Sequence, residues 1–124
     1  MKRIAIRPHR SNYPNPICFD VGDRVIVGGR DSSEYPGWTW ARTADGNAGW
    51  APESILSLID GDAALAKDRY TARELDTEVG DTFVVIRELN GWCWVRAIRG
   101  NEGWIPIATT VELPLAADAK RDAR

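Results

Sequence analysis

The feature that most constrains this chain is an internal repeat. The segment GWTWARTADGNAGWAP at 37–52 returns 54 residues later as GWCWVRAIRGNEGWIP at 91–106. Aligned without gaps, the copies share glycines, tryptophans, an arginine, an asparagine and a proline at matching positions, and DVGDRVIV at 20–27 matches EVGDTFVV at 78–85. A unit of about 55 residues is too long for a two-member solenoid and suits a very small domain. We therefore expect two domains.

The repeat also sets the expected boundaries. The first domain covers residues 1–57 and the second covers residues 64–113, with a short linker at 58–63 between them. The tail 114–124 has no turn chemistry and a small, charged composition, so we expect it to be flexible. The first copy has a longer loop before its GW pair, GGRDSSEYPG against RELNG in the second.

Within each copy the pattern predicts short strands joined by tight turns. Residues 81–89 are rich in β-branched and aromatic side chains, and Asn90-Gly91 is a hairpin signal because both positions tolerate positive φ. Residues 92–98 alternate as a returning strand, 99–103 form a glycine-rich turn, and 104–107 read as a third strand. We expect an all-β chain built as antiparallel barrels or sandwiches.

All six tryptophans lie inside the repeat, three in each copy. Because residues i and i+2 of a strand share a face, Trp92 and Trp94 point one way while Cys93 and Val95 point the other. A thin core suits valine and cysteine better than stacked indoles, so the tryptophans are expected to form an exposed aromatic shelf suited to binding. The alternative is that they wrap the edge of the core.

Composition excludes several other classes of protein. The net charge of −2 provides no general field for nucleic acid or anionic lipid. No apolar run follows MKRIAIRPHR, and nothing approaches a membrane span, so we expect a cytoplasmic protein.

Cys18 and Cys93 do not correspond between the copies and are expected to be buried thiols. His9 is the single histidine, so we expect no catalytic residues, no metal and no cofactor.

The order of these motifs resembles an SH3 domain of the bacterial, variant type, repeated in tandem. DRYTARELDTEVGD at 68–81 resembles the family's first aromatic motif and its acidic RT loop. NGWCW at 90–94 resembles the n-Src loop and the tryptophan that follows it, and GNEGWIP at 100–106 resembles the distal hairpin and the late proline. The resemblance implies two SH3-like five-stranded barrels that bind proline-rich peptides in the polyproline II conformation.

The resemblance also implies binding residues. In the second copy the aromatic shelf would be Tyr70, Trp92, Trp104 and Pro106. The acidic pocket for a flanking Arg or Lys would be Glu74, Asp76 and Glu78. In the first copy the counterparts are Trp38, Trp50 and Pro52, with Tyr13 as a further ring. The sequence departs from the family at Asp68, Thr109 and Ile55, where tyrosines are expected. Both grooves therefore lack rings.

The favoured hypothesis is a non-catalytic interaction module whose partners are proteins or peptides, including proline-rich ones. It would bind no nucleic acid or membrane and would be a monomer or a weak homodimer. One alternative is a nucleic-acid-binding SH3-like protein, although the basic residues are scattered along the chain. Another is a structural pair whose tryptophan faces pack on each other. An enzyme is disfavoured, because the sequence has no Ser–His–Asp set and no phosphate-binding glycine loop.

Overall fold

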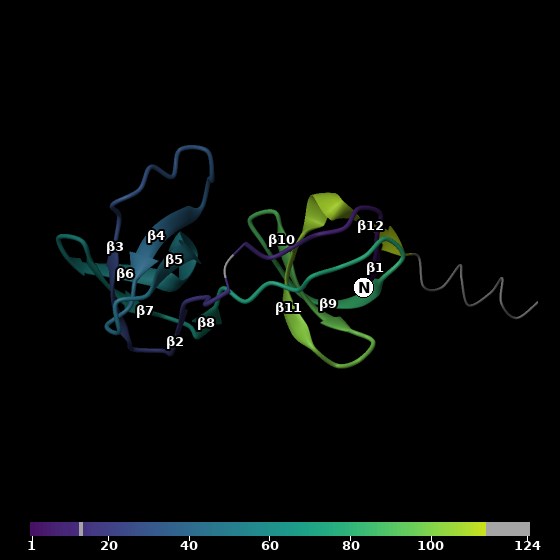
Figure 1. The fold of residues 1–124 in the computed structure, drawn as a ribbon. Coiled ribbons are helices and arrows are strands. Elements are labelled where there is room, and N and C mark those ends of the chain that lie inside the picture. The colour runs from purple at the N-terminus through teal and green to yellow at the C-terminus, as the bar shows by residue number, and fades with distance from the viewer. Residues whose placement is uncertain (13, 114–124) are drawn as a thin grey trace, which may run out of the picture. The chain divides into compact units, whose positions relative to one another are not determined.

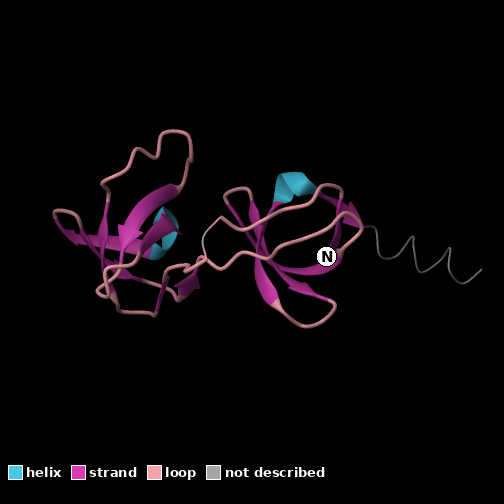
Figure 2. Ribbon diagram, viewed as in Figure 1, coloured by secondary structure: helices cyan, strands magenta, loops and turns pink. Residues whose placement is uncertain are grey.

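The structure is a computed structural model that describes residues 1–12 and 14–113. Within these residues the chain contains strands and two 3₁₀ turns, η1 (Glu53–Ile55) and η2 (Ile107–Thr109), and no α-helix (Figure 2). The predicted all-β class is confirmed. The expectations for the flexible tail and for Tyr13 fall outside the described residues.

The chain divides into two compact units that do not follow the order of the repeats. One, called here the discontinuous unit, consists of residues 1–12 together with the chain from residue 74 onward. The other, called here the inserted unit, is the continuous stretch 13–73. The chain therefore enters the inserted unit from the discontinuous unit and returns to it.

The discontinuous unit is a five-stranded antiparallel sheet in the order β11-β10-β9-β1-β12. Its strands are β1 (Lys2–Ala5), β9 (Thr82–Leu89), β10 (Trp92–Ala97), β11 (Glu102–Pro106) and β12 (Thr110–Leu113). In Figure 1, β1 is drawn in purple among the green and yellow strands of the second repeat. It pairs with β9 through Ile4 and Thr82 and with β12 through Ala5 and Thr110.

The inserted unit has a matching five-stranded sheet in the order β5-β4-β3-β7-β6. Its strands are β3 (Arg24–Val27), β4 (Trp38–Arg42), β5 (Ala48–Pro52), β6 (Leu56–Asp60) and β7 (Ala63–Ala66). A two-stranded ribbon completes the unit, formed by β2 (Cys18–Phe19) and β8 (Tyr70–Thr71).

Comparison of the two sheets shows that each repeat pairs with a strand from the other end of the repeat order: β1 joins the sheet of the second repeat, and β7 joins the sheet of the first. The second repeat takes β1 from the start of the chain, whereas β7 pairs with β3 and β6 of the first repeat. This division differs from the expected boundaries 1–57 and 64–113, because the segment expected as a linker, 58–63, includes the end of β6 and the start of β7. Both strands are four residues long and end in a buried alanine, Ala5 and Ala66, so this feature alone does not decide which sheet each one joins.

Charge complementarity favours the observed pairing. Residues 1–12 carry four basic side chains and no acidic ones: Lys2, Arg3, Arg7 and Arg10. Residues 74–81, which run alongside them, carry four acidic side chains and no basic ones: Glu74, Asp76, Glu78 and Asp81. Backbone hydrogen bonds between His9 and Thr77 run in both directions, at 3.2 and 2.9 Å. Opposite charges on neighbouring strands stabilise this register.

The hairpin and the strands predicted for the second repeat are confirmed, although β11 begins at Glu102, within the predicted turn 99–103, and ends at Pro106, because Ile107 begins η2. Asn90 and Gly91 both adopt positive φ, 49° and 89°, between β9 and β10. Cys93 and Val95 are fully buried and lie on the core side of β10, whereas Trp92 and Trp94 stay partly exposed. The core of this unit consists of Ala5, Leu75, Phe83, Cys93, Val95 and Ile105.

Candidate functional site

The outer face of the β10–β11 hairpin collects the tryptophans of the second repeat. In the antiparallel register Trp92 lies opposite Pro106, and Trp94 lies opposite Trp104. Directly opposed residues share a face, so these four side chains lie on the side of the hairpin away from the core. Trp94 and Trp104 meet edge to face, with ring centroids 5.4 Å apart. The repeat therefore does gather its aromatic residues on one surface.

The RT-loop segment covers part of this surface. Trp104 is only 5 % exposed, because residues 74–75 run beside it: Glu74 forms a parallel bridge with Trp104, and the Leu75 amide donates to the Trp104 carbonyl at 3.1 Å. Trp92 and Trp94 remain half-buried. Trp104 therefore contributes mainly to packing, and the accessible indole surface belongs to Trp92 and Trp94.

One end of this surface is fixed by a carboxylate. The Trp94 indole Nε1–H donates to Glu102 at 2.8 Å, and the Arg96 guanidinium donates to the other carboxylate oxygen at 3.0 Å. These two donors, the indole first, lower the pKa of the Glu102 carboxyl below its ordinary value of 4.5. Trp94 is thus held in one orientation by a charged neighbour.

At the other end, Trp92 meets a residue from the start of the chain. The His9 ring approaches Trp92 edge to face, with centroids 5.7 Å apart and ring planes at 77°. His9 was not among the predicted site residues, since the sequence reasoning considered it only as a metal ligand or catalyst. Spacing could have identified it: His9 follows Ala5 by four positions, as Tyr70 follows Ala66, and the two alanines are equivalent in the two sheets.

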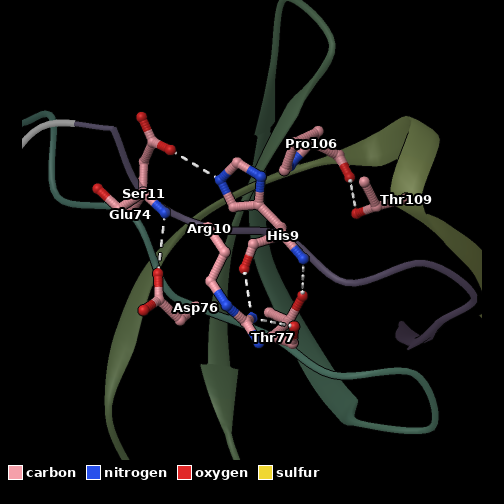
Figure 3. A network of polar contacts seen from close by, with 8 residues as sticks. All are labelled: His9, Arg10, Ser11, Glu74, Asp76, Thr77, Pro106 and Thr109. Carbon is pink, nitrogen blue, oxygen red and sulfur yellow. Dashed lines mark hydrogen bonds and ion pairs between the residues drawn. The ribbon is translucent and has the colours of Figure 1, made fainter.

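The three acidic residues predicted to form a pocket are each engaged by the N-terminal segment. The His9 ring Nε2 lies 2.7 Å from the Glu74 carboxylate, and the Ser11 backbone N–H donates to Asp76 at 2.8 Å. The Arg10 guanidinium forms an ion pair with Glu78. Figure 3 shows His9, Arg10 and Ser11 facing Glu74, Asp76 and Thr77.

Arg7 and Thr109 occupy positions near the late proline. The Thr109 hydroxyl donates to the Pro106 carbonyl at 2.8 Å, on the side of His9 away from Glu74 in Figure 3. The Arg7 guanidinium donates to the Ala108 carbonyl. The segment that follows Pro106 thus contributes a hydroxyl group and binds a guanidinium group, while Trp92 itself contacts the His9 imidazole.

Tyr70, predicted to share a groove with Trp92, belongs to the inserted unit. Its ring packs on Phe19, with centroids 5.5 Å apart, and its hydroxyl donates to the Trp50 carbonyl at 2.9 Å. Tyr70 is 8 % exposed, Trp38 is 9 % exposed, and Pro52 is fully buried. Of the residues predicted as the first-copy shelf, Trp38 and Pro52 are therefore buried, whereas Trp50 is half-buried.

The accessible aromatic surface of the inserted unit lies around Trp40 and Trp50. These two rings meet edge to face at 5.3 Å, and Tyr35 from the longer loop packs against Trp50 at 5.0 Å. The Arg30 guanidinium lies 4.3 Å from the Trp40 ring centroid, a cation–π geometry. The extra loop residues of the first repeat thus place a cation on its indole face.

The described residues contain neither a metal-binding cluster nor a membrane-spanning helix. Across 1–12 and 14–113, no group of three or more His, Cys, Asp or Glu residues is arranged to hold a metal ion. Within the same residues, no helix is long and apolar enough to cross a membrane.

Comparison with known proteins identifies both repeats. Residues 68–107 match the family described as SH3 domain, and residues 3–59 match the family described as variant SH3 domain. Neither the curated proteins nor the solved structures contain a match to this chain.

Proposed function

Because this chain is a tandem SH3 protein, and SH3 domains are in general non-catalytic modules for protein interaction, we propose that it binds an extended peptide of a partner protein beside Trp92. The observation that carries the proposal is the half-buried Trp92 ring, which lies opposite Pro106 and edge-on to His9. An indole and a proline on one rigid hairpin present an apolar surface with one donor.

The proposed site lies on the discontinuous unit because exposure differs between the repeats. Trp38, the counterpart of Trp92, is 9 % exposed, and Pro52, the counterpart of Pro106, is fully buried. Trp92 and Pro106 both keep partial exposure. A peptide that contacts both the indole and the proline therefore has more accessible surface at Trp92 and Pro106 than at Trp38 and Pro52.

The preferred ligand is an extended, proline-containing segment. A polyproline II segment is already ordered before binding, so it loses little conformational entropy on an aromatic surface. Glu74, Asp76 and Glu78 already hold His9, Ser11 and Arg10, so a flanking cation on the ligand has to compete with the chain's own groups. We therefore propose that apolar contact with Trp92 dominates affinity and that added salt weakens binding only slightly.

The test is a proline-rich peptide array probed with the wild-type protein and with Trp92→Ala and Trp40→Ala. Trp40→Ala is the matched control, since it removes a half-buried indole from the other repeat. Loss of signal with Trp92→Ala alone, while the fold is retained, supports the proposed site. Loss with Trp40→Ala alone moves the site to the inserted unit, and an array with no signal for the wild type contradicts peptide binding of this kind.

Cysteine chemistry supports a proposal for the cellular location. Cys18 and Cys93 are both free thiols. Unpaired thiols are typical of reducing compartments, so we propose that the module acts in the cytoplasm.

A further inference from the structure

The discontinuous unit is completed by a segment that is remote in sequence. Residues 1–12, called here the N-terminal arm, are separated from the rest of that unit by the whole inserted unit, 13–73. The arm supplies β1, which lies between β9 and β12, and its Ala5 side chain is 2 % exposed within the core. Without the arm, the facing edges of β9 and β12 have no partner between them, and the core loses a member.

The arm is bound along its whole length by groups that recognise its sequence. The Arg3 guanidinium donates to the Thr110 hydroxyl at 2.6 Å, and the Ala5 amide donates to the Asp81 carbonyl at 2.8 Å. Farther along, His9 and Arg10 meet Glu74 and Glu78. These contacts form a receptor for a basic strand, with backbone pairing supplying affinity and the acidic row supplying selectivity.

The inserted unit does not depend on the arm. It is continuous in sequence and takes its corresponding strand, β7, from its own end. Its Arg69 side chain pairs within the unit, lying 3.5 Å from Asp20. Among the described residues, release of the arm therefore leaves the sheet β5-β4-β3-β7-β6 of the inserted unit with all of its strands.

From these observations we propose that the arm of one copy binds the receptor of a second copy, giving a dimer in which two chains exchange residues 1–12. Such an exchange retains each contact between arm and receptor and changes only the path of the chain near residue 12. The arm's own receptor competes with an effective concentration of about millimolar, so the monomer dominates in micromolar solution. The dimer forms when chains refold together at concentrations on the order of millimolar.

The test uses two full-length variants with opposite charge reversals, Arg10→Glu and Glu78→Arg. Arg10 and Glu78 are 57 % and 64 % exposed, so neither change disturbs the core. Each variant alone places like charges together in its closed monomer. In a mixed exchanged dimer, one interface pairs the two reversed residues and the other pairs the two native residues, so both interfaces are attractive.

Equal amounts of the two variants are refolded together at high concentration, diluted in the cold, and analysed by size-exclusion chromatography with light scattering and by native mass spectrometry. We expect a mixed dimer that exceeds either homodimer several-fold and persists on dilution, because separation requires the arm to open. The double variant Arg10→Glu/Glu78→Arg is the control and should behave as the wild type does. Monomers alone, or dimers with a statistical distribution of the two chains, would overturn the proposal.

Discussion

The His9 imidazole lies 2.7 Å from the Glu74 carboxylate, which joins a residue near the start of the chain to one 65 positions later. Both side chains are mostly covered, at 14 % and 13 % exposure, and the same imidazole meets Trp92 edge-on. One side chain therefore anchors the N-terminal arm and borders the proposed peptide site. Changes in arm docking and changes at this edge of the site are physically coupled through it.

Replacement of this imidazole is the first prediction. His9→Ala removes the partner of a covered carboxylate and the ring contact with Trp92, so the discontinuous unit should lose about 1–3 kcal/mol of unfolding free energy. Urea denaturation followed by tryptophan fluorescence measures the change. Glu53→Ala, an exposed site on η1 of the inserted unit, is the control. Equal stability of His9→Ala and the control variant would contradict the anchoring role.

Two equivalent glycines of the repeat provide the second prediction. A Cβ added to Gly103 would lie 2.9 Å from Leu75 Cγ and 3.2 Å from the Leu75 backbone nitrogen. At Gly49, the equivalent position, the nearest atom is Ile17 Cγ1 at 3.3 Å. Overpacking against backbone costs about 1–3 kcal/mol, so Gly103→Ala should destabilise the protein clearly more than Gly49→Ala. Thermal unfolding by circular dichroism compares them, and the reverse order would contradict the packing described here.

The pH dependence of stability yields the third prediction, at Glu102. The Trp94 indole and the Arg96 guanidinium lower the pKa of this carboxyl in the folded state. The ionised form therefore stabilises the fold above the ordinary value of 4.5, and this contribution disappears as the pH falls through the lowered folded-state pKa. Glu102→Gln should be less stable than the wild type at neutral pH and equally stable in strong acid.

Melting temperatures measured from neutral to strongly acidic pH test the Glu102 prediction. Glu112→Gln, which removes an exposed carboxylate from β12, controls for the change in net charge. A gap between wild type and Glu102→Gln that is independent of pH would show that the carboxylate's charge is not what stabilises Trp94.

Much of the fold follows from local sequence signals. The Asn90-Gly91 dipeptide marks a hairpin because both residues accept positive φ, and the alternation of Trp92 and Trp94 with Cys93 and Val95 separates the outer face from the core. These signals act over a few residues, so a single chain displays them directly. They locate the strands and the aromatic face.

The pairing of β1 with the second repeat was not predicted, because β1 and β7 are both short strands that end in a buried alanine, and local signals do not say which sheet a strand joins. The difference lies in the net charge of longer segments, since the four basic residues within 1–12 run beside the four acidic residues within 74–81. The single ion pairs are alike, because Arg10 pairs with Glu78 and Arg69 pairs with Asp20. Tyr70 was assigned to the same site as Trp92 because the second domain was expected to be continuous in sequence. In the structure the residue beside Trp92 is His9, which belongs to the N-terminal arm of the discontinuous unit.

The last prediction concerns the two thiols, which the structure places in opposite environments. Cys93 is fully buried in the core of the discontinuous unit, as expected, and burial raises the pKa of its thiol. The expectation of a buried thiol is wrong for Cys18, which lies exposed on β2. Because the thiolate is the reactive form, iodoacetamide should modify Cys18 in the native protein and Cys93 only after unfolding. Peptide mass spectrometry measures the extent of labelling at both cysteines as the urea concentration increases. In the Cys18→Ser variant, only the labelling of Cys93 remains. Rapid native labelling of Cys93 would contradict its burial in the core cluster that also contains Ala5, Phe83 and Ile105.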